Sequence, residues 1–325
     1  MIQAGIIGGA GYTAGELIRL LLGHSKVTIN FVYSTSSAGK KISTIHQDLE
    51  GTTDQLFTDS IKTDVDILFL CLGHGNSKAF LEKNSFSKTT KIIDLSNDFR
   101  LTEDAVFQEM PFVYGLTELN RAAIKSAQYI ANPGCFATAI QLAILPLAAS
   151  SLIKDAIHVN AVTGATGAGT ALSPTTHFTW RVDNFSHYKA FNHQHLGEIH
   201  QSVNSLQQDL DSIIHFIPNR GNFSRGIFAT IYTTYEGTLE TAISLFKNYY
   251  KEAEFTFVSD TSIHLKQVIN TNKCLLHLEV HDGKLLVTSV IDNLLKGASG
   301  QAVQNMNLMY GFEAHLGLQL KANYF

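Results

Sequence analysis

Short apolar runs alternate with polar or glycine-rich turns in the first half of the chain. Residues 2–7, 27–33 and 65–72 are short and mostly apolar, which is typical of strands buried in a parallel sheet. Residues 16–22, which follow the first run, have apolar side chains at helical spacing. Residues 91–100 indicate a further strand with a polar end. Strands that alternate with helices predict an α/β domain.

A different pattern begins after residue 150. We expect strands at residues 158–163, 213–217, 226–235, 273–280 and 284–291. The last two flank His281-Asp282-Gly283, which is typical of a hairpin turn. Long strands without intervening helices predict a second, α+β domain with a mixed or antiparallel sheet. Residues 297–310 indicate a helix that returns to the first domain.

A glycine-rich turn joins the first strand to the first helix. Its spacing, Gly8-x-x-Gly11-x-x-Ala14, is a relative of the dinucleotide-binding pattern G-x-G-x-x-G. Gly8 permits the tight turn, and Gly11 lets a pyrophosphate approach the N–H groups at the helix N-terminus. We expect Gly8, Gly11, Tyr12 and Thr13 to bind a dinucleotide cofactor. The alternative is a plain turn between strand and helix.

The end of the second strand indicates which dinucleotide binds. A unit that prefers NAD usually carries Asp or Glu at this position, bonded to the ribose 2′-hydroxyl. Residues 34–41 contain no acid and offer hydroxyl groups and two lysines instead. Ser34, Ser36 and Lys40 therefore favour a 2′-phosphate, and the predicted cofactor is NADPH or NADP. An ordinary polar loop is the alternative.

Cys135 lies directly after Pro133-Gly134 and before an apolar run, residues 136–147, that we expect to form a buried helix. The cysteine therefore falls in the first turn, where unpaired N–H groups and the helix dipole stabilise a thiolate. The same N–H groups could hold an oxyanion formed on a carbonyl that the thiolate attacks. A lone cysteine is otherwise a buried, inert residue.

Histidines and arginines in the second half supply candidate partners. His193, His195 and Glu198 form the densest titratable cluster, without a known zinc spacing, so no metal site is expected. One histidine could serve Cys135 as general acid and base, and Glu198 could orient an imidazole or bind substrate. Arg225 is a candidate for a bidentate carboxylate contact, and Arg220 competes for that role. The alternative is that the histidines of this cluster are ordinary surface residues without a catalytic role.

Composition limits the class of protein. The chain has 325 residues, 45% hydrophobic and 16% charged, which suffices for two domains with a large core. A net charge of −4 gives no basic footprint for nucleic acid. The three cysteines are widely spaced, which fits a reducing compartment. With no apolar run long enough to span a bilayer, we expect a cytoplasmic protein without a membrane partner.

Six motifs, in order along nearly the whole chain, resemble the N-acetyl-gamma-glutamyl-phosphate reductase family. They are Gly8-x-x-Gly11-Tyr12-Thr13, Asp94-Leu95-Ser96-x-Asp98-Phe99-Arg100, Tyr114-Gly115-Leu116, Asn132-Pro133-Gly134-Cys135-Phe136, His193-x-His195-x-x-Glu198-Ile199 and Asp292-Asn293-Leu294-x-Lys296-Gly297. The Pro-Gly-Cys and Asp-Asn-Leu-x-Lys-Gly stretches are the specific ones.

The resemblance implies a fold similar to that of aspartate-semialdehyde dehydrogenase. Residues 1–134 and 298–325 would form a Rossmann-type NADP-binding domain with a parallel sheet. Residues 135–297 would form an α+β catalytic domain with a mixed or antiparallel sheet. The second domain would also make the subunit contacts of a homodimer or homotetramer.

The resemblance also implies a reaction in arginine biosynthesis, in which NADPH reduces an N-acyl-γ-glutamyl phosphate to the semialdehyde and phosphate is released. Cys135 would carry a thioester, with His193, or its rival His195, as proton donor. Arg100 would draw the leaving phosphate, and Arg225 would hold the substrate α-carboxylate. The residues expected near the nicotinamide half of the cofactor are Asn293, Lys296 and Gly297.

Departures from the family pattern bear on the substrate. Gly197 replaces the usual proline before Glu198, and residues 219–224 follow the pattern poorly. If this loop lines the acyl end, the acyl group need not be acetyl, and N-succinyl is the alternative. Two other functions compete: an aspartate-semialdehyde dehydrogenase or another acyl-phosphate reductase, and a catalytically silent NADP-binding regulatory protein.

Overall fold

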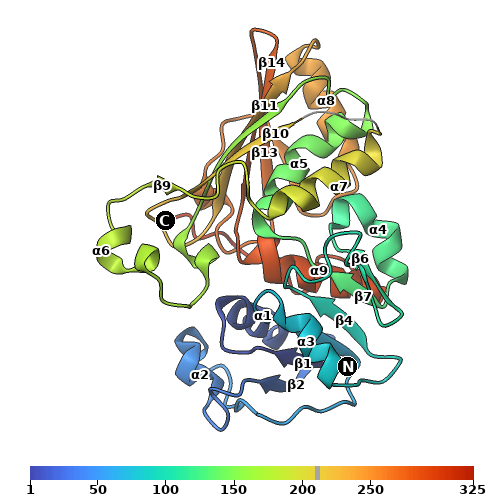
Figure 1. Cartoon of the computed structure of the whole chain (residues 1–325), viewed down its shortest axis with the longest axis vertical. Helices are drawn as coiled ribbons and strands as arrows, with labels where there is room; N and C mark the ends of the chain where they lie inside the picture. Colours follow the sequence, from blue (N-terminus) through green and yellow to red (C-terminus); the bar gives the residue numbers. More distant parts are fainter. Residues whose placement is uncertain (209–212) are drawn as a thin grey trace. The chain divides into compact units, whose positions relative to one another are not determined.

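A computed structural model describes residues 1–208 and 213–325, which form two compact units (Figure 1). The first unit comprises Met1–Pro133 and Ala298–Leu318, and the second comprises Gly134–Gly297 and Gln319–Phe325. Both boundaries between the units, after residues 133 and 297, lie within one residue of the positions expected from the sequence. The carboxyl-terminal tail differs, because residues 319–325 cluster with the second unit rather than the first.

The first unit contains a seven-stranded sheet in the order β2-β1-β3-β4-β7-β6-β5. Its strands are β1 (Ile2–Ile7), β2 (Val27–Tyr33), β3 (Ile67–Leu70), β4 (Lys91–Asp94), β5 (Val106–Phe107), β6 (Met110–Tyr114) and β7 (Tyr129–Ala131). All neighbours pair in parallel except β5 and β6. The reversal of strand order at β1 and β3 is the feature of a Rossmann-type sheet at which ligands bind. The predicted α/β architecture is confirmed.

Five helices accompany this sheet in the described part of the first unit. They are α1 (Tyr12–Leu22), α2 (Ile42–Ile45), α3 (Asn76–Lys83), α4 (Thr117–Ser126) and α9 (Gly300–Met309). Helix α9 comes from the far end of the chain and packs against α1 and α4 (Figure 1). Asn305 on α9 donates to the carbonyl of Gly115 at 2.9 Å and to Asn132 Oδ1 at 3.1 Å. The returning helix thus completes the first unit.

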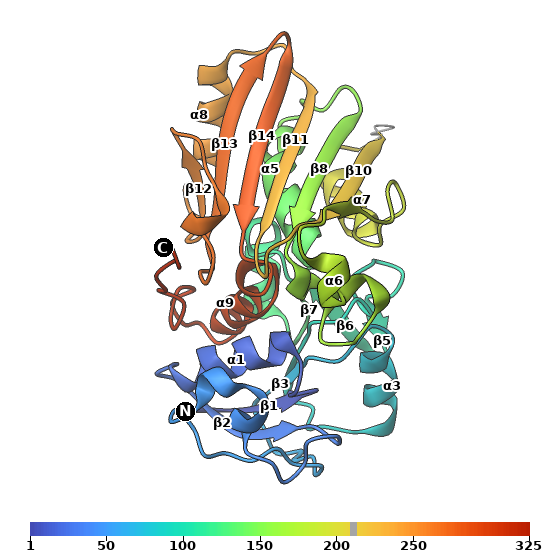
Figure 2. The same ribbon diagram turned by 90° about the vertical axis from the view of Figure 1, so that its left-hand side faces the viewer.

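The second unit contains a mixed seven-stranded sheet in the order β12-β13-β14-β11-β8-β10-β9 (Figure 2). Its strands are β8 (Ile157–Thr163), β9 (Ser186–His187), β10 (Ile214–Arg220), β11 (Ile227–Thr234), β12 (Thr256–Ser259), β13 (Cys274–His281) and β14 (Lys284–Ile291). Neighbours β12 and β13, and β8 and β10, are parallel, and the other pairs are antiparallel. The predicted mixed sheet is confirmed, as is the hairpin turn at residues 281–283.

The helices of the second unit are α5 (Cys135–Ala149), α6 (Phe178–Arg181), α7 (His195–Leu206) and α8 (Leu239–Tyr249). Helix α5 packs on β11 and β14 and contacts α7 and α8 (Figure 1). Its residues from Phe136 to Ala148 are all buried. Pro146 lacks the N–H that would bond to the carbonyl of Leu142, and the hydroxyl of Tyr250 donates to that carbonyl instead, at 2.6 Å. The apolar helix is thereby held intact against the sheet.

In the described ranges 1–208 and 213–325, the longest apolar helices fall short of what a membrane crossing requires.

Candidate active site

Cys135 is the first residue of α5 in the second unit and is half-buried. The preceding residue, Gly134, caps the helix in an extended conformation, and the first turn carries no acidic side chain among the described residues. The N–H groups of this turn therefore point their partial positive charge at the thiol without a competing carboxylate of their own. This position suits a thiolate and an oxyanion formed beside it.

Glu198 connects the cysteine loop to α7. Its Oε2 accepts a hydrogen bond from the backbone N–H of Gly134 at 2.9 Å, and the side chain is only 2% exposed. Its Oε1 lies 3.9 Å from Nε2 of His195, one turn earlier on the same helix. One buried carboxylate thus fixes the residue before Cys135 and lies next to an imidazole.

His193 and His195 lie edge to face, with ring centroids 4.6 Å apart, against Phe136 and Phe216. Burial, with a smaller contribution from the charge of Lys189, lowers the pKa of His193 to about 4, so that this imidazole is neutral at pH 7. The backbone N–H of His195 donates to Nδ1 of His193 at 3.2 Å. Because Nδ1 accepts, neutral His193 carries its proton on Nε2 and acts there as a donor.

Tyr188 is a site residue that the sequence reading missed. Its ring lies edge to face with that of His193, at 5.8 Å between centroids. Burial, with a smaller contribution from a negative charge on Cys135, raises the pKa of Tyr188 to about 12. The guanidinium carbon of Arg220 lies over the Tyr188 ring, 4.8 Å from its centroid, and Arg220 opposes the rise of this pKa. The only local signal was that Tyr188 lies five residues before His193.

Gly297, predicted to bind the cofactor, has a packing role against Cys135. A Cβ at position 297 would lie 2.7 Å from Cβ and 3.1 Å from Cα of Cys135, so only glycine fits. The N–H of Gly297 donates to the carbonyl of Asp292 at 3.0 Å, which closes the turn. The Asp-Asn-Leu-x-Lys-Gly stretch therefore packs directly against the cysteine through its final glycine.

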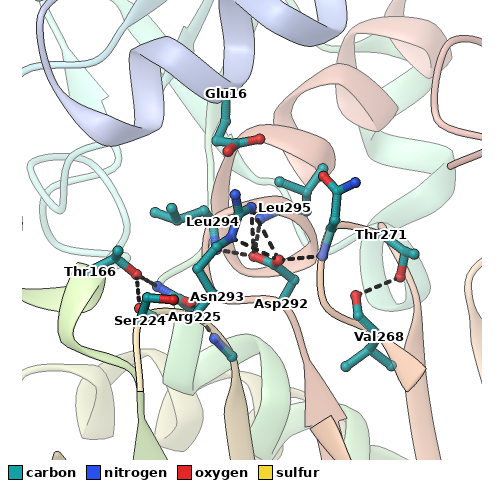
Figure 3. A network of polar contacts seen from close by, with 12 residues as sticks. Glu16, Thr166, Ser224, Arg225, Val268, Thr271, Asp292, Asn293, Leu294 and Leu295 are labelled. Carbon is teal, nitrogen blue, oxygen red and sulfur yellow. Dashed lines mark hydrogen bonds and ion pairs between the residues drawn. The ribbon is translucent and has the colours of Figure 1, made fainter. Parts of the chain in front are cut away.

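Arg225, predicted to hold a substrate carboxylate, is bonded to Asp292 instead (Figure 3). Its Nε and Nη2 donate to the two carboxylate oxygens at 3.1 and 3.2 Å. Asp292 is fully buried and also accepts from the N–H groups of Asn270, Leu294 and Leu295. This carboxylate already occupies the fork of Arg225, and the predicted substrate-carboxylate role of Arg225 or Arg220 stays a prediction.

Asn293 and Lys296, also predicted near the cofactor, are buried in the second unit. Asn293 Oδ1 accepts from the N–H of Gly226 at 2.7 Å, and its Nδ2 donates to Thr166 Oγ1 at 3.0 Å. Thr166 in turn donates to the carbonyl of Ser224 at 2.6 Å (Figure 3). Asn293 therefore joins the small-residue loop after β8 to the loop before β11.

The glycine turn of the first unit has the geometry that a dinucleotide requires. Gly8 adopts a φ of 82°, and a Cβ there would lie 2.6 Å from the carbonyl oxygen of Cys71. Gly11 is the N-cap of α1, and a Cβ there would have no heavy atom of the described residues within 4 Å. In the described structure, no side chain caps α1, so that its N–H groups and the open space suit a pyrophosphate.

The other predicted cofactor residues surround this turn or the end of β2. Tyr12 is exposed, and the carbonyl of Thr13 accepts from Ser299 Oγ at 2.7 Å. Ser34 is buried, with its Oγ 3.4 Å from Oγ of Ser36. Ser36 and Lys40 are exposed. Two hydroxyls and a cation at the end of β2 are groups that suit a 2′-phosphate.

Arg100 lies in the first unit, where it is 5% exposed. Its Nε donates to the carbonyl of Asn132 at 2.8 Å, and its Nη2 donates to the carbonyl of Leu95 at 3.0 Å. The backbone N–H of Asn132 donates to the carbonyl of Asp94 at 2.7 Å. Arg100 therefore braces the segment that precedes Pro133, and its predicted contact with phosphate stays a prediction.

Family models match both units. Residues 3–127 match the NAD binding domain of semialdehyde dehydrogenase, and residues 135–293 match its dimerisation domain. Among solved structures, aspartate semialdehyde dehydrogenase II of Vibrio cholerae, complexed with ASA, has a TM-score of 0.72 at 16% identity and covers 96% of this chain and 98% of its own. The enzyme of Candida albicans with NADP has a TM-score of 0.68 at 15% identity, covering 95% and 98%. Fold and site thus define the class of semialdehyde dehydrogenases, with an NAD(P)-binding first unit.

Curated relatives show which family within the class of semialdehyde dehydrogenases this chain belongs to. The N-acetyl-gamma-glutamyl-phosphate reductase of Christiangramia forsetii is 65% identical over 325 residues, which is all of both chains. The enzyme of the same name from Flavobacterium johnsoniae is 58% identical, again over both full lengths. The chain belongs to the N-acetyl-gamma-glutamyl-phosphate reductase family, as its motifs predicted.

Proposed function

We propose that this protein reduces an N-acyl-γ-glutamyl phosphate to the N-acyl-glutamate semialdehyde, with NADPH as reductant and Cys135 as nucleophile, in arginine biosynthesis. The observation that carries the proposal is the position of Cys135 at the start of α5. There Glu198 holds the N–H of Gly134, and Gly297 packs against the cysteine. This arrangement leaves the thiol half-buried next to helical N–H groups, as acyl transfer requires.

The first half of the reaction transfers the acyl group. The thiolate of Cys135 attacks the γ-carbonyl carbon, and the oxyanion forms beside the N–H groups of α5 and the Nε2–H of neutral His193. The carbon–oxygen bond to phosphate then breaks with its electron pair, which leaves a thioester on Cys135. The thiol proton moves through an imidazole to the departing phosphate, so atoms and charge balance.

The second half reduces the thioester. When bound, NADPH would supply the hydride that reduces the thioester. The resulting oxyanion collapses and expels the cysteine sulfur, which takes up one proton, and the aldehyde is released. His195 is the better proton carrier of the two histidines, because it lies 3.9 Å from the Glu198 carboxylate, whereas His193 is held neutral with Nδ1 occupied.

The test is the reverse reaction. We expect phosphate-dependent reduction of NADP⁺ with N-acetyl- or N-succinyl-glutamate semialdehyde, and its loss in the variant Cys135→Ser. Activity with aspartate semialdehyde instead would favour the competing acyl-phosphate reductase function. Absence of activity with all three aldehydes would favour a silent NADP-binding protein. Normal activity of Cys135→Ser would contradict the mechanism.

We propose a homodimer built from second units, which the matched dimerisation domain supports. One face of the second sheet carries His158, which stacks on Tyr232 at 4.8 Å and on His215 at 5.0 Å. Tyr232 is 44% exposed. We expect Tyr232→Asp to lower the molar mass measured by light scattering, whereas exposed Lys154→Gln leaves it unchanged. The expected cytoplasmic location stays a prediction.

A further inference from the structure

Arg181 and Arg220 are two positively charged side chains of the second unit that have no acidic partner among the residues that the structure describes. Arg181 ends α6 and is 7% exposed, and Arg220 ends β10. Among the ion pairs of the described residues, neither guanidinium contacts an Asp or a Glu. A buried cation without a counter-charge is unfavourable, because it has lost its hydration.

Both guanidiniums also retain unused donors. The Nε of Arg181 and the Nε of Arg220 are buried and have no hydrogen-bond acceptor within the described residues. Arg181 Nη2 donates to the carbonyl of Asn184 at 3.0 Å, and the Arg220 guanidinium lies over the Tyr188 ring. Each guanidinium has five N–H donors, so several remain on each side chain. These donors are available to a bound anion.

The positive charges of Arg181 and Arg220 repel one another. Burial lowers the pKa of Arg181, and the positive charge of Arg220 lowers it further. An anion bound by both side chains would offset this repulsion and supply acceptors for both Nε groups. Arginine is suited to planar, bidentate carboxylate binding, which adds geometric specificity.

Tyr188 connects the arginine pair to the candidate active site. Arg220 lies over the Tyr188 ring at 4.8 Å, and that ring contacts His193 at 5.8 Å. The pKa of Tyr188 also responds to a negative charge on Cys135. The pair is therefore one aromatic side chain away from the residues proposed to act on the γ-carbonyl. A substrate that reacts at its γ-carbon carries its carboxylate groups several bonds away.

We propose that Arg181 and Arg220 form a carboxylate subsite for the N-acyl-glutamyl substrate, an inference that rests on the proposed function. The carboxylate has two possible sources. One is the α-carboxylate of the glutamyl group, and the other is the terminal carboxylate of an acidic acyl group such as succinyl. Arg225 does not compete for either, because Asp292 occupies its fork.

Binding can be measured without turnover. Trp180 is the only tryptophan of the chain and directly precedes Arg181, so its fluorescence reports on the subsite. The probes are N-acetylglutamine, which has the α-carboxylate alone, and N-succinylglutamine, which adds the acyl carboxylate. We expect Arg181→Gln and Arg220→Gln to weaken binding about 10- to 100-fold. Lys154→Gln, which removes an exposed ion pair with Glu236, is the matched control.

The two probes distinguish the source of the carboxylate. Equal loss for both ligands assigns the subsite to the α-carboxylate. Tighter wild-type binding of N-succinylglutamine, with a loss confined to that ligand, assigns it to the acyl group. Arg220→Lys keeps the charge without the planar fork, and we expect an intermediate affinity, which serves as the test if Arg220→Gln does not fold. Unchanged affinity in folded variants of both arginines would refute the subsite.

Kinetics of the reverse reaction separate this proposal from the proposed function. We expect both Gln variants to raise KM for the semialdehyde about 10- to 100-fold, with KM for phosphate and NADP⁺ within about twofold of wild type. A rise confined to KM for phosphate would make the pair a phosphate site and overturn the inference. An inactive wild type would refute the proposed function alone, because the fluorescence titration still tests the subsite.

Discussion

The carboxylate of Glu198 accepts a hydrogen bond from the backbone N–H of Gly134 at 2.9 Å, 64 residues earlier in the chain. Gly134 directly precedes Cys135, so α7 holds the start of α5 in place through one buried oxygen. The same carboxylate lies 3.9 Å from His195. Glu198 therefore acts as a positioning residue for both the nucleophile and the proposed proton carrier.

Replacing Glu198 tests this positioning role. Glu198→Ala leaves the buried N–H of Gly134 without its acceptor, and we expect a loss of about 1–3 kcal/mol in the free energy of unfolding together with a lower kcat. Glu198→Gln keeps an oxygen acceptor but not the charge, so it should restore most of the stability while kcat stays low. Denaturant unfolding and the reverse assay measure the two effects. Equal stability of the Ala variant and wild type would contradict the structural role.

Alkylation distinguishes the three cysteines. Cys135 is half-buried at a helix start, whereas Cys274 is buried and burial raises the pKa of Cys71. We expect iodoacetamide to modify Cys135 first, with one equivalent abolishing activity, as peptide mass mapping would show. Cys71→Ser should be inactivated at the wild-type rate. Modification of Cys71 in parallel with the loss of activity would argue against Cys135 as nucleophile.

His193 gives stability a pH dependence. Its folded pKa of about 4 lies below its ordinary value of 6.5, so the unfolded chain binds the proton first as pH falls. Stability is therefore full above pH 6.5 and declines between 6.5 and 4, by about 3 kcal/mol from this group. Melting temperatures measured across this range should fall less steeply for His193→Gln than for wild type. An identical slope would show that His193 is not held neutral by the fold.

Arg225 and Asp292 are expected to contribute to stability more than to substrate binding. Arg225→Gln leaves the fully buried Asp292 without its cation, and we expect a loss of about 3–5 kcal/mol. Lys247→Gln, which breaks the exposed pair with Asp260, should leave the free energy of unfolding nearly unchanged. Urea unfolding measures the free energy of unfolding of both variants and of the wild type. A stable Arg225→Gln with a raised KM for the aldehyde would restore its predicted carboxylate role.

The preference for NADPH over NADH tests whether residues at the end of β2 bind the 2′-phosphate of the cofactor. Ser36 is exposed, so Ser36→Asp introduces a charge that repels a 2′-phosphate and can accept from a ribose hydroxyl. We expect the ratio of kcat/KM for NADPH to that for NADH to fall at least about tenfold. Thr28→Asp, at an exposed position near the other end of β2, is the control. An unchanged ratio would place the 2′-phosphate elsewhere.

Local patterns allowed much of the fold to be predicted. The strands predicted at residues 2–7 and 27–33 match β1 and β2, because nearly continuous apolar runs of that length fit a buried parallel sheet. The helix predicted at residues 136–147 agrees with α5 within two residues at each end, since Pro133-Gly134 precedes it and its side chains are mostly apolar. The tail, residues 319–325, is expected in the first domain but clusters with the second unit, because no local pattern in it indicates which unit it packs on.

By itself the sequence determined the two-unit α/β and α+β architecture, the family, and the helix-start position of Cys135, because periodicity and turn residues are local properties. Only the tertiary structure decided which charges meet. Asp292 pairs with Arg225, which lies 67 residues earlier in the chain, and Glu198 accepts from the N–H of Gly134. Among the described residues, no acid pairs with Arg220 or Arg181. Those pairings depend on strand register and helix packing, and the roles of the arginines follow from them.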